Sequence, residues 1–192
     1  MKHNLITLTI DHKTVEVPEG TTILAAAKSV GISIPTLCYL NLSDFGCVNT
    51  PSSCRMCLVE VEGRRNLAPA CVTPASDKMT VSTNSVRALK TRKTMLELLL
   101  SDHPKNCLTC QKSGNCELQS LADKFSIRDI KLKGEQSAYR LDISKSLIRD
   151  MDKCIMCRRC ETMCNEVQTV GVLSAINRGF ESVIATAMEI NL

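Results

Sequence analysis

The sequence has no tryptophan and few aromatic residues of any kind. Aromatic side chains make up 3% of its 192 residues, so little large apolar surface is available to build a core. This scarcity argues against a fold held by hydrophobic packing alone, and we expect a second source of stability. No stretch approaches the ~18–20 consecutive apolar residues of a transmembrane helix. We therefore expect no membrane span.

Targeting and nucleotide-binding signals are also missing. The apolar run Leu5–Ile10 is too short for the core of a signal peptide, and no small-residue cleavage site follows it. The predicted location is therefore the cytoplasm, where thiols stay reduced and disulfides are rare. No Gly-x-Gly-x-x-Gly fingerprint occurs, so the sequence shows no dinucleotide-binding motif.

Charge of one sign is not concentrated enough to suggest a nucleic-acid partner. The formal net charge is only +4, and it counts the thiols as neutral. The basic run Arg87–Lys93 is interpreted as the solvated face of a helix, with docking of a partner as the alternative.

Cysteine is abundant instead, with twelve residues in the chain. In a reducing compartment, clustered cysteines are typical of metal sites rather than disulfides. They fall into three groups that differ in spacing, and the spacing of each group indicates its chemistry.

The first group comprises Cys38, Cys54, Cys57 and Cys71. A C-x2-C turn directs two thiolates to one centre while backbone amides point toward the sulfurs, and one more ligand on each side lets four thiolates hold two irons. A structural zinc site with four Cys ligands is the alternative, although zinc ribbons usually contain two C-x2-C pairs. Cys47 has no spacing that pairs it with the turn and is predicted to be a spare thiol.

The second group comprises His103, Cys107, Cys110 and Cys116, in the form H-x3-C-x2-C-x5-C. A histidine at a helix end is often only a cap, but this one lies four positions before a C-x2-C and is a candidate ligand. Zinc on three Cys and one His is the alternative. In a cluster, a neutral imidazole in place of a thiolate should raise the reduction potential.

The third group is the run Cys154, Cys157, Cys160 and Cys164. C-x2-C-x2-C-x3-C is the ferredoxin motif for cubane clusters, and in two-cluster ferredoxins the fourth Cys serves the other cluster. Asn165 replaces the proline that usually follows, and no second run occurs before Leu192. The fourth ligand of this cluster is therefore open: Cys164 is either unused or a substitute.

Patterning outside the cysteines predicts an α+β fold. Residues 4–17 alternate as a β-hairpin, residues 22–30 form a helix that ends at Gly31, and strands are expected at 58–61 and 79–82. A helix is predicted over 86–101, with Val86, Leu89, Leu96, Leu99 and Leu100 on one face. A short helix is expected around 117–124, a polar linker over 126–150, and a final hairpin around Arg178-Gly179.

In this order, the three groups resemble a known family. The matching stretches are Ile34–Leu40, Ser53–Gly63, Ala70–Cys71, Leu98–Pro104, Gly114–Gln119 and Cys154–Glu161. They are similar to the N-terminal iron–sulfur region of the large subunit of NADH-linked, electron-bifurcating [FeFe]-hydrogenases. The same region occurs in the large peripheral iron–sulfur subunit of complex I and in related NAD-linked formate dehydrogenases and transhydrogenases.

The resemblance implies three cluster modules. It implies a β-grasp domain over 1–83 with a [2Fe-2S] cluster on Cys38, Cys54, Cys57 and Cys71. It implies a helical domain over 84–125 with a [4Fe-4S] cluster on His103, Cys107, Cys110 and Cys116. A partial ferredoxin-like module over 151–192, after the linker, would hold a [4Fe-4S] cluster on Cys154, Cys157 and Cys160.

The implied function is relay of single electrons in a multisubunit NAD(H)-linked oxidoreductase, and this chain contains no complete catalytic site. The implied partners are an NADH-binding flavoprotein carrying FMN, a thioredoxin-like [2Fe-2S] subunit, and a terminal redox enzyme or ferredoxin. A truncated catalytic subunit of an [FeFe]-hydrogenase and a zinc-stabilised interaction module are the alternatives. The first is tested by the mass of the native polypeptide and the second by visible absorption.

Overall fold

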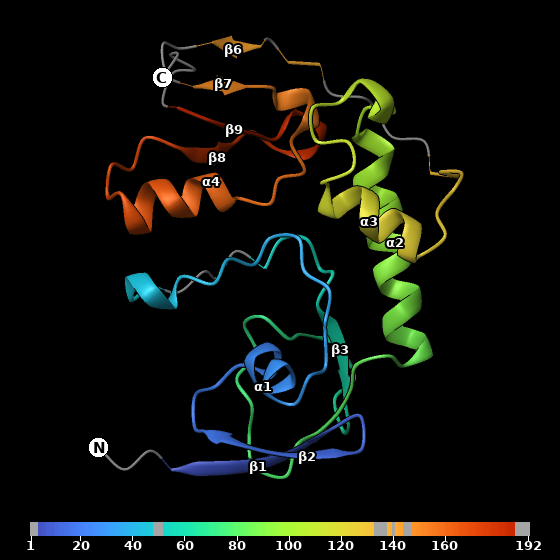
Figure 1. Cartoon of the computed structure of the whole chain (residues 1–192), viewed down its shortest axis with the longest axis vertical. Helices are drawn as coiled ribbons and strands as arrows, with labels where there is room; N and C mark the ends of the chain where they lie inside the picture. The colour runs from blue at the N-terminus through green and yellow to red at the C-terminus, as the bar shows by residue number, and fades with distance from the viewer. Residues whose placement is uncertain (1–3, 48–51, 133–137, 140, 144–146, 187–192) are drawn as a thin grey trace. The chain divides into compact units, whose positions relative to one another are not determined.

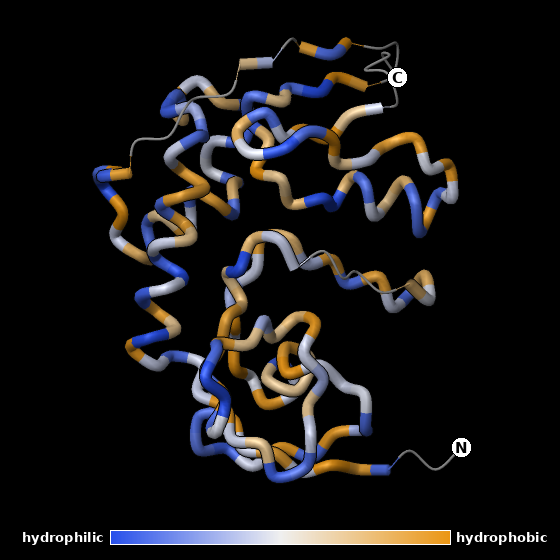
Figure 2. The backbone as a smooth tube through the Cα atoms, turned by 180° about the vertical axis from the view of Figure 1, so that it is seen from behind, coloured by the Kyte–Doolittle hydropathy of each residue, from blue (hydrophilic) through white to orange (hydrophobic). Residues whose placement is uncertain are grey.

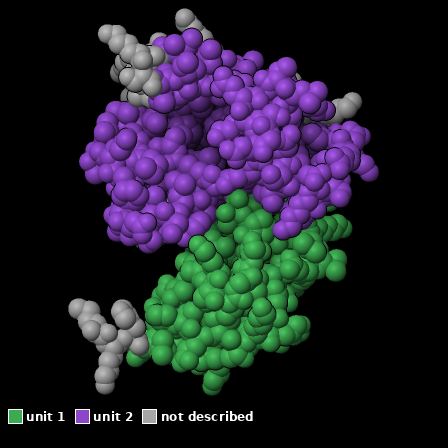
Figure 3. All heavy atoms as spheres, viewed as in Figure 1, with its two compact units in different colours: residues 1–36, 54–95 green, residues 37–53, 96–192 purple. Residues whose placement is uncertain are grey.

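The structure is a computed structural model of the 192-residue chain. It describes residues 4–47, 52–132, 138–139, 141–143 and 147–186. The chain divides into two compact units, coloured separately in Figure 3. Unit 1 comprises residues 1–36 and 54–95, and unit 2 comprises residues 37–53 and 96–192. The finer boundaries at 83, 125 and 150 stay a prediction.

Unit 1 contains a mixed five-stranded sheet in the order β2-β1-β5-β3-β4. The strands are β1 (Leu5–Ile10), β2 (Lys13–Pro18), β3 (Leu58–Val61), β4 (Ala68–Pro69) and β5 (Thr80–Ser82). β1 and β2 form the predicted antiparallel hairpin, with Leu8 opposite Val15. β5 pairs parallel with β1 and antiparallel with β3. The predicted strands and the α+β class are confirmed.

The core of unit 1 lies between this sheet and helix α1 (Ile23–Ser29), which contacts β2 (Figure 1). Alternate residues of β1 are buried, and α1 buries Ile23, Ala26 and Ala27. The helix is coloured mostly hydrophobic in Figure 2. The Thr22 side chain caps the helix by accepting a hydrogen bond from the Ala25 amide at 3.3 Å, as Thr does at N-caps. Gly31 follows it in the left-handed conformation expected from the sequence.

Helix α2 (Val86–Asp102) confirms the helix predicted over 86–101 and begins after Ser85, whose Oγ accepts from the Ala88 amide at 3.2 Å. The predicted apolar face is only partly correct. Val86 is 83% exposed, whereas the fully buried stripe is Ala88, Arg92 and Leu96. These positions are four apart and therefore share one face of a helix. The buried arginine also corrects the interpretation of 87–93 as a wholly solvated face.

Unit 2 is built from short elements. Its helices are η1 (Ser43–Phe45), η2 (Cys107–Thr109), α3 (Glu117–Lys124), η3 (Met151–Lys153), α4 (Arg159–Thr162), the π-helical turn η4 (Met163–Val167) and η5 (Gly179–Glu181). Two antiparallel pairs accompany them, β6 (Asp142–Ile143) with β7 (Ile148–Arg149), and β8 (Ser174–Ile176) with β9 (Val183–Ala185). The second pair confirms the final hairpin, and the first lies within the expected linker. Within the described residues, no helix is both long and apolar enough to cross a membrane.

Candidate iron–sulfur cluster sites

The strand pairing of unit 1 brings two cysteines of the first group together. Cys57 directly precedes β3 and Cys71 follows β4, and these strands are paired. The Ala70 amide donates to the Cys57 carbonyl at 3.1 Å, and the two Sγ atoms lie 3.3 Å apart. This separation is far longer than a disulfide bond of about 2 Å, and neither cysteine is in a disulfide. Two sulfurs at this distance can bind one metal centre.

The other cysteines of the group are also buried. Cys54 begins the C-x2-C turn in unit 1, where Arg55 has a positive φ of 56°. A left-handed conformation at a residue other than glycine costs about 1–3 kcal/mol and is typical of functional sites. Cys38 is buried in segment 37–53, which belongs to unit 2. Cys47 is half-buried, and its Sγ donates weakly to the Phe45 and Glu166 carbonyls, which fits a spare thiol.

A charged residue that the sequence did not single out lies beside this group. The Arg92 guanidinium is buried, and its Nε and Nη2 donate to the Leu58 carbonyl at 2.9 and 2.6 Å. Burial lowers the pKa of Arg92, while the neighbouring Cys57 and then Asp11 oppose that shift. The spacing of Ala88, Arg92 and Leu96 was the only sequence signal that could have identified it.

Three members of the second group line a cavity in unit 2. His103 directly follows α2, Cys110 ends η2 and Cys116 is the N-cap of α3. All three line a cavity of about 370 Å³. Cys107 begins η2, is exposed, and is not among the lining residues. The structure therefore gathers three of the four predicted ligands around one space.

The state of His103 fits a ligand. Its Nδ1 is buried and has no hydrogen-bond partner. Burial lowers the pKa of His103, and Lys153 adds to that shift, although Asp102 and Asp150 oppose it. The neutral imidazole, which burial favours, is the form that binds metals. An orphaned buried nitrogen in a cavity that two thiols also line fits an iron–sulfur cluster.

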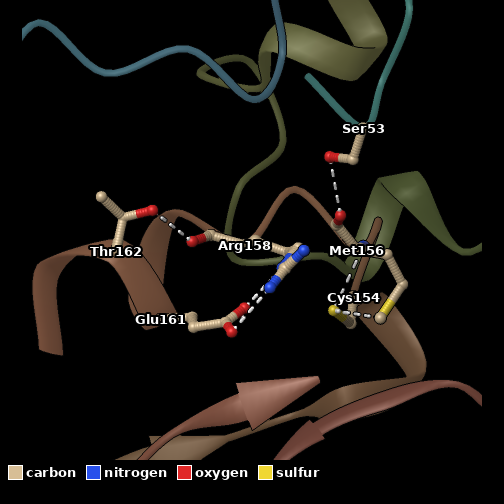
Figure 4. Close-up of polar contacts among 6 residues, drawn as sticks. All are labelled: Ser53, Cys154, Met156, Arg158, Glu161 and Thr162. Atoms are coloured by element: carbon tan, nitrogen blue, oxygen red, sulfur yellow. Dashed lines mark hydrogen bonds and ion pairs between the residues drawn. The ribbon is translucent and has the colours of Figure 1, made fainter. Parts of the chain in front are cut away.

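The third group lies along a turn and a short helix of unit 2 (Figure 4). Cys154 follows η3, Cys160 lies within α4, and the Met156 amide donates to the Cys154 Sγ at 3.3 Å. Amide donation to sulfur is the interaction that stabilises a reduced cluster. Met156 and Arg158 have positive φ angles of 51° and 59°, so this motif repeats the strained backbone of the first group.

Thiol electrostatics also place these cysteines together. Burial raises the pKa of Cys154. The neighbouring thiols of Cys157 and Cys160 raise this pKa further, and the Met156 amide opposes the shift. Burial likewise raises the pKa of Cys160, with Cys157 adding to it, against backbone donors and Arg149. These crowded thiols resist ionisation when no cation is present. A bound metal centre would deprotonate them and neutralise their mutual repulsion. Cys164 is buried against Leu173 and Ile184, with Cys154 packed beside this cluster.

Polar contacts hold this turn in place (Figure 4). The Arg158 guanidinium donates to both Glu161 carboxylate oxygens at 2.6 and 2.8 Å. This contact lowers the pKa of Glu161 despite burial. Thr162 Oγ1 donates to the Arg158 carbonyl, and Ser53 Oγ donates to the Met156 carbonyl, each at 3.1 Å. The backbone that carries the motif is thus fixed on both sides.

The second and third groups border one another. Cys157 lines the same cavity as His103, Cys110 and Cys116. An ion pair of 2.7 Å joins Arg159 Nη1 to Glu117 Oε2. Arg159 precedes Cys160 in the chain, and Glu117 follows Cys116. No three His, Cys, Asp or Glu side chains in the described part of the chain are gathered as a site for a single metal ion. In a cubane the ligands spread over several irons.

Comparisons with known proteins define the class first. Residues 3–86 match the family model of a 2Fe-2S iron–sulfur cluster binding domain. Residues 92–131 match the NADH-ubiquinone oxidoreductase-G iron–sulfur binding region. The chain is therefore an iron–sulfur protein with [2Fe-2S] and [4Fe-4S] binding domains in tandem. The ligand sets of these clusters stay predictions.

Similar proteins then identify the family. A chain of the NAD⁺-reducing [NiFe]-hydrogenase in its H2-reduced state superposes with a TM-score of 0.83 and 30% identity, over 94% of this chain and 74% of that chain. The HndD subunit of the NADP-reducing hydrogenase of Solidesulfovibrio fructosivorans is 65% identical over 98% of this chain. The G 2 subunit of the NADH-quinone oxidoreductase of Rhizobium meliloti is 38% identical over 94%.

The chain belongs to the iron–sulfur family represented in NAD(P)-linked hydrogenases and in the G-type subunits of NADH-quinone oxidoreductases. The resemblance inferred from the cysteine motifs is confirmed. The chain spans 32% of the length of HndD and 21% of the length of the Rhizobium meliloti relative.

Proposed function

We propose that this chain relays single electrons within an NAD(H)-linked, flavin-based oxidoreductase. The observation that carries the proposal is the cavity that His103, Cys110 and Cys116 share with Cys157. Ligands of two predicted centres line one space, so electrons would pass between them over a short distance. Membership of a family found in hydrogenases and quinone oxidoreductases supports the same role.

The proposed ligands follow the three cysteine groups. Unit 1 supplies Cys54, Cys57 and Cys71 to a [2Fe-2S] cluster in a β-grasp domain, and Cys38 is the proposed fourth ligand. The parallel pairing of β1 with β5 and the helix packed on the sheet support the β-grasp assignment. The proposed [4Fe-4S] ligands are His103, Cys107, Cys110 and Cys116, and then Cys154, Cys157 and Cys160. Cys164 is the candidate fourth ligand of the last cluster.

When bound, such clusters accept and donate one electron at a time. The residues of the chain bind them, exclude water and set their potentials through ligand type, hydrogen bonds and burial. The Met156 amide favours negative charge on Cys154. His103 contributes a neutral ligand, which raises the potential relative to an all-thiolate site. Lys153 and Arg159 line the cavity of the second group. Their positive charges favour the reduced, more negative form of a cluster bound there.

The proposed partners are an NADH-binding flavoprotein with FMN, a thioredoxin-like [2Fe-2S] subunit, and a terminal redox enzyme or ferredoxin in the cytoplasm. A role in electron bifurcation is part of this proposal. A second candidate is the N-terminal part of a hydrogenase catalytic subunit, which the 65% identity to HndD over 32% of its length favours.

Anaerobic purification of the native protein with its associated subunits tests the proposal. We expect acid-labile sulfide, iron, and two classes of electron paramagnetic resonance signal on stepwise reduction, one from [2Fe-2S] and one from [4Fe-4S] centres. Protein that contains zinc and no acid-labile sulfide would contradict it. The intact mass separates the two candidates: a mass near 21.1 kDa supports a short relay subunit, and a much larger mass supports the hydrogenase.

A further inference from the structure

Helix α2 buries a charge where an apolar side chain is expected. Ala88, Arg92 and Leu96 form its fully buried stripe, and Arg92 is 1% exposed. Lys90 and Lys93, on other faces of the same helix, are exposed. Burying an unpaired charge costs several kcal/mol even after the protein relaxes. Arg92 therefore needs an anionic neighbour, and an apolar residue would otherwise serve better.

Carboxylates do not supply that neighbour. Among the described residues, Arg92 takes part in none of the ion pairs closer than 4.0 Å. Its Nε and Nη2 donate only to the Leu58 carbonyl, which satisfies hydrogen bonds but leaves the charge unbalanced. Asp11 is the carboxylate that acts on the pKa of Arg92, and both of its oxygens accept hydrogen bonds from Thr83, from the amide at 2.7 Å and from the hydroxyl.

The remaining group that can carry negative charge is the pair Cys57 and Cys71, as thiolates. Leu58, whose carbonyl holds the guanidinium, directly follows Cys57 in the chain, and Cys57 Sγ lies 3.3 Å from Cys71 Sγ. The electrostatic influence of Cys57 on the pKa of Arg92 exceeds that of Asp11. The guanidinium is thus held by the carbonyl of the residue that follows Cys57, and a metal centre would keep the Cys57 and Cys71 thiols as thiolates.

We infer that Arg92 is the buried counter-ion of the iron–sulfur centre at Cys57 and Cys71, and that it raises the reduction potential of that centre. The inference rests on the proposed [2Fe-2S] site. A thiolate-bound cluster is anionic and gains a further negative charge on reduction, so a nearby fixed cation stabilises the reduced form more than the oxidised form. Burial strengthens this effect because the interior screens charges far less than water.

An arginine suits this position better than a lysine would. Its planar fork can give two hydrogen bonds to one carbonyl and stays charged when buried. The position of the charge is therefore set by the backbone of β3 rather than by a flexible chain. Salt should screen the effect little, since screening is weak for buried pairs.

The test uses the full chain loaded with clusters, with the potential of the [2Fe-2S] centre measured by anaerobic redox titration and electron paramagnetic resonance. Arg92→Gln keeps a donor for the Leu58 carbonyl and removes the charge, and Arg92→Met removes both. Arg92→Lys keeps the charge. Lys93→Gln makes the same charge change one residue away on the exposed surface of α2 and is the matched control.

We expect Arg92→Gln and Arg92→Met to lower the equilibrium constant for one-electron reduction roughly tenfold, which is about 59 mV for a single electron. Arg92→Lys and Lys93→Gln should change it less than about twofold, which is under ~20 mV on the same scale. The effect should persist in high salt. Potentials of the [4Fe-4S] centres should not change.

A wild-type potential in a loaded Arg92→Gln or Arg92→Met protein would overturn the inference. If neither loads a cluster while Arg92→Lys does so at the wild-type potential, assembly itself requires the charge and the inference is supported. If Arg92→Lys also fails to load, or if its equilibrium constant for reduction falls tenfold, the hydrogen-bonding fork matters rather than the charge and the inference is wrong. A wild-type chain with no [2Fe-2S] signal would instead refute the proposed function.

Discussion

The cysteines of unit 1 and those of unit 2 lie in different surroundings. In unit 1, Cys54, Cys57 and Cys71 are buried beside a sheet whose strands and helix share an apolar core. In unit 2, Cys107 and Cys160 are exposed, and most of the other cysteines are half-buried on short helices and turns. The buried cluster around Cys164, Leu173 and Ile184 in unit 2 is small.

This difference indicates two ways of building a metal site. A sheet with its own core can position thiolates before a cluster arrives, as the pairing of β3 and β4 positions Cys57 and Cys71. Short turns without a large core depend on the ligands themselves for their geometry, because metal binding contributes directly to folding. Unit 2 should therefore depend on its clusters more strongly than unit 1.

Removal of all clusters should have the largest effect, and it tests directly whether unit 2 depends on its clusters more than unit 1 does. We expect anaerobic chelation to abolish hydrogen-exchange protection in α3 and α4, while amides of β1 and β2 stay protected. For scale, structural zinc contributes about 10–16 kcal/mol to the folding of small domains. Equal loss of protection in both units would contradict the distinction, and reconstitution with iron and sulfide is the control.

Loss of one ligand should act on the [2Fe-2S] site. Cys57→Ala should abolish the [2Fe-2S] resonance signal and raise hydrogen exchange across the described residues of 38–71, because one of four thiolates is lost. Cys47→Ala, which removes the predicted spare thiol, is the matched control and should leave every cluster signal unchanged. An intact [2Fe-2S] spectrum in Cys57→Ala would show that the ligand assignment is wrong.

A core substitution should separate packing from ligation. Leu8→Ala in β1 should lower the unfolding free energy of unit 1 by about 2–5 kcal/mol, since it leaves a cavity in the core. Hydrogen exchange of β2 amides measures this effect without assuming a two-state transition of the whole chain. Leu5→Ala, on the same strand but 61% exposed, should change it by less than ~0.5 kcal/mol. Altered [4Fe-4S] signals in Leu8→Ala would mean that the two units are not energetically distinct.

His103→Cys should have the smallest effect on stability. Its main effect should be on the reduction potential of the cluster at this site. Replacing a neutral imidazole with an anionic thiolate should keep a cluster and lower its reduction potential by on the order of 100 mV. Redox titration measures the shift. His12→Cys, in the exposed turn between β1 and β2, adds a thiol without touching a ligand group and should leave the potential unchanged. A higher potential in His103→Cys would contradict the charge argument.

The sequence by itself determined the cysteine groups, the β1–β2 hairpin, helices α1, α2 and α3, and the family. Those features depend on residue spacing and local propensity: C-x2-C turns, alternation in β1, and a threonine at position 21 or 22 that can cap the first helix. The local pattern also predicted the helix over 86–101 but assigned the wrong buried face to it. Helical periodicity shows which residues share a face, but it does not show what an arginine on that face will contact.

Tertiary structure alone decided which groups come together. The burial of Arg92 against Leu58, the approach of Cys57 to Cys71, and the cavity shared by His103, Cys116 and Cys157 each join residues from separate elements. Cys57 and Cys71 are 14 positions apart, and this separation alone does not set the 3.3 Å between their sulfurs. Charge balance in a buried site depends on such distances, because Coulomb energy depends on separation and surroundings rather than on sequence order.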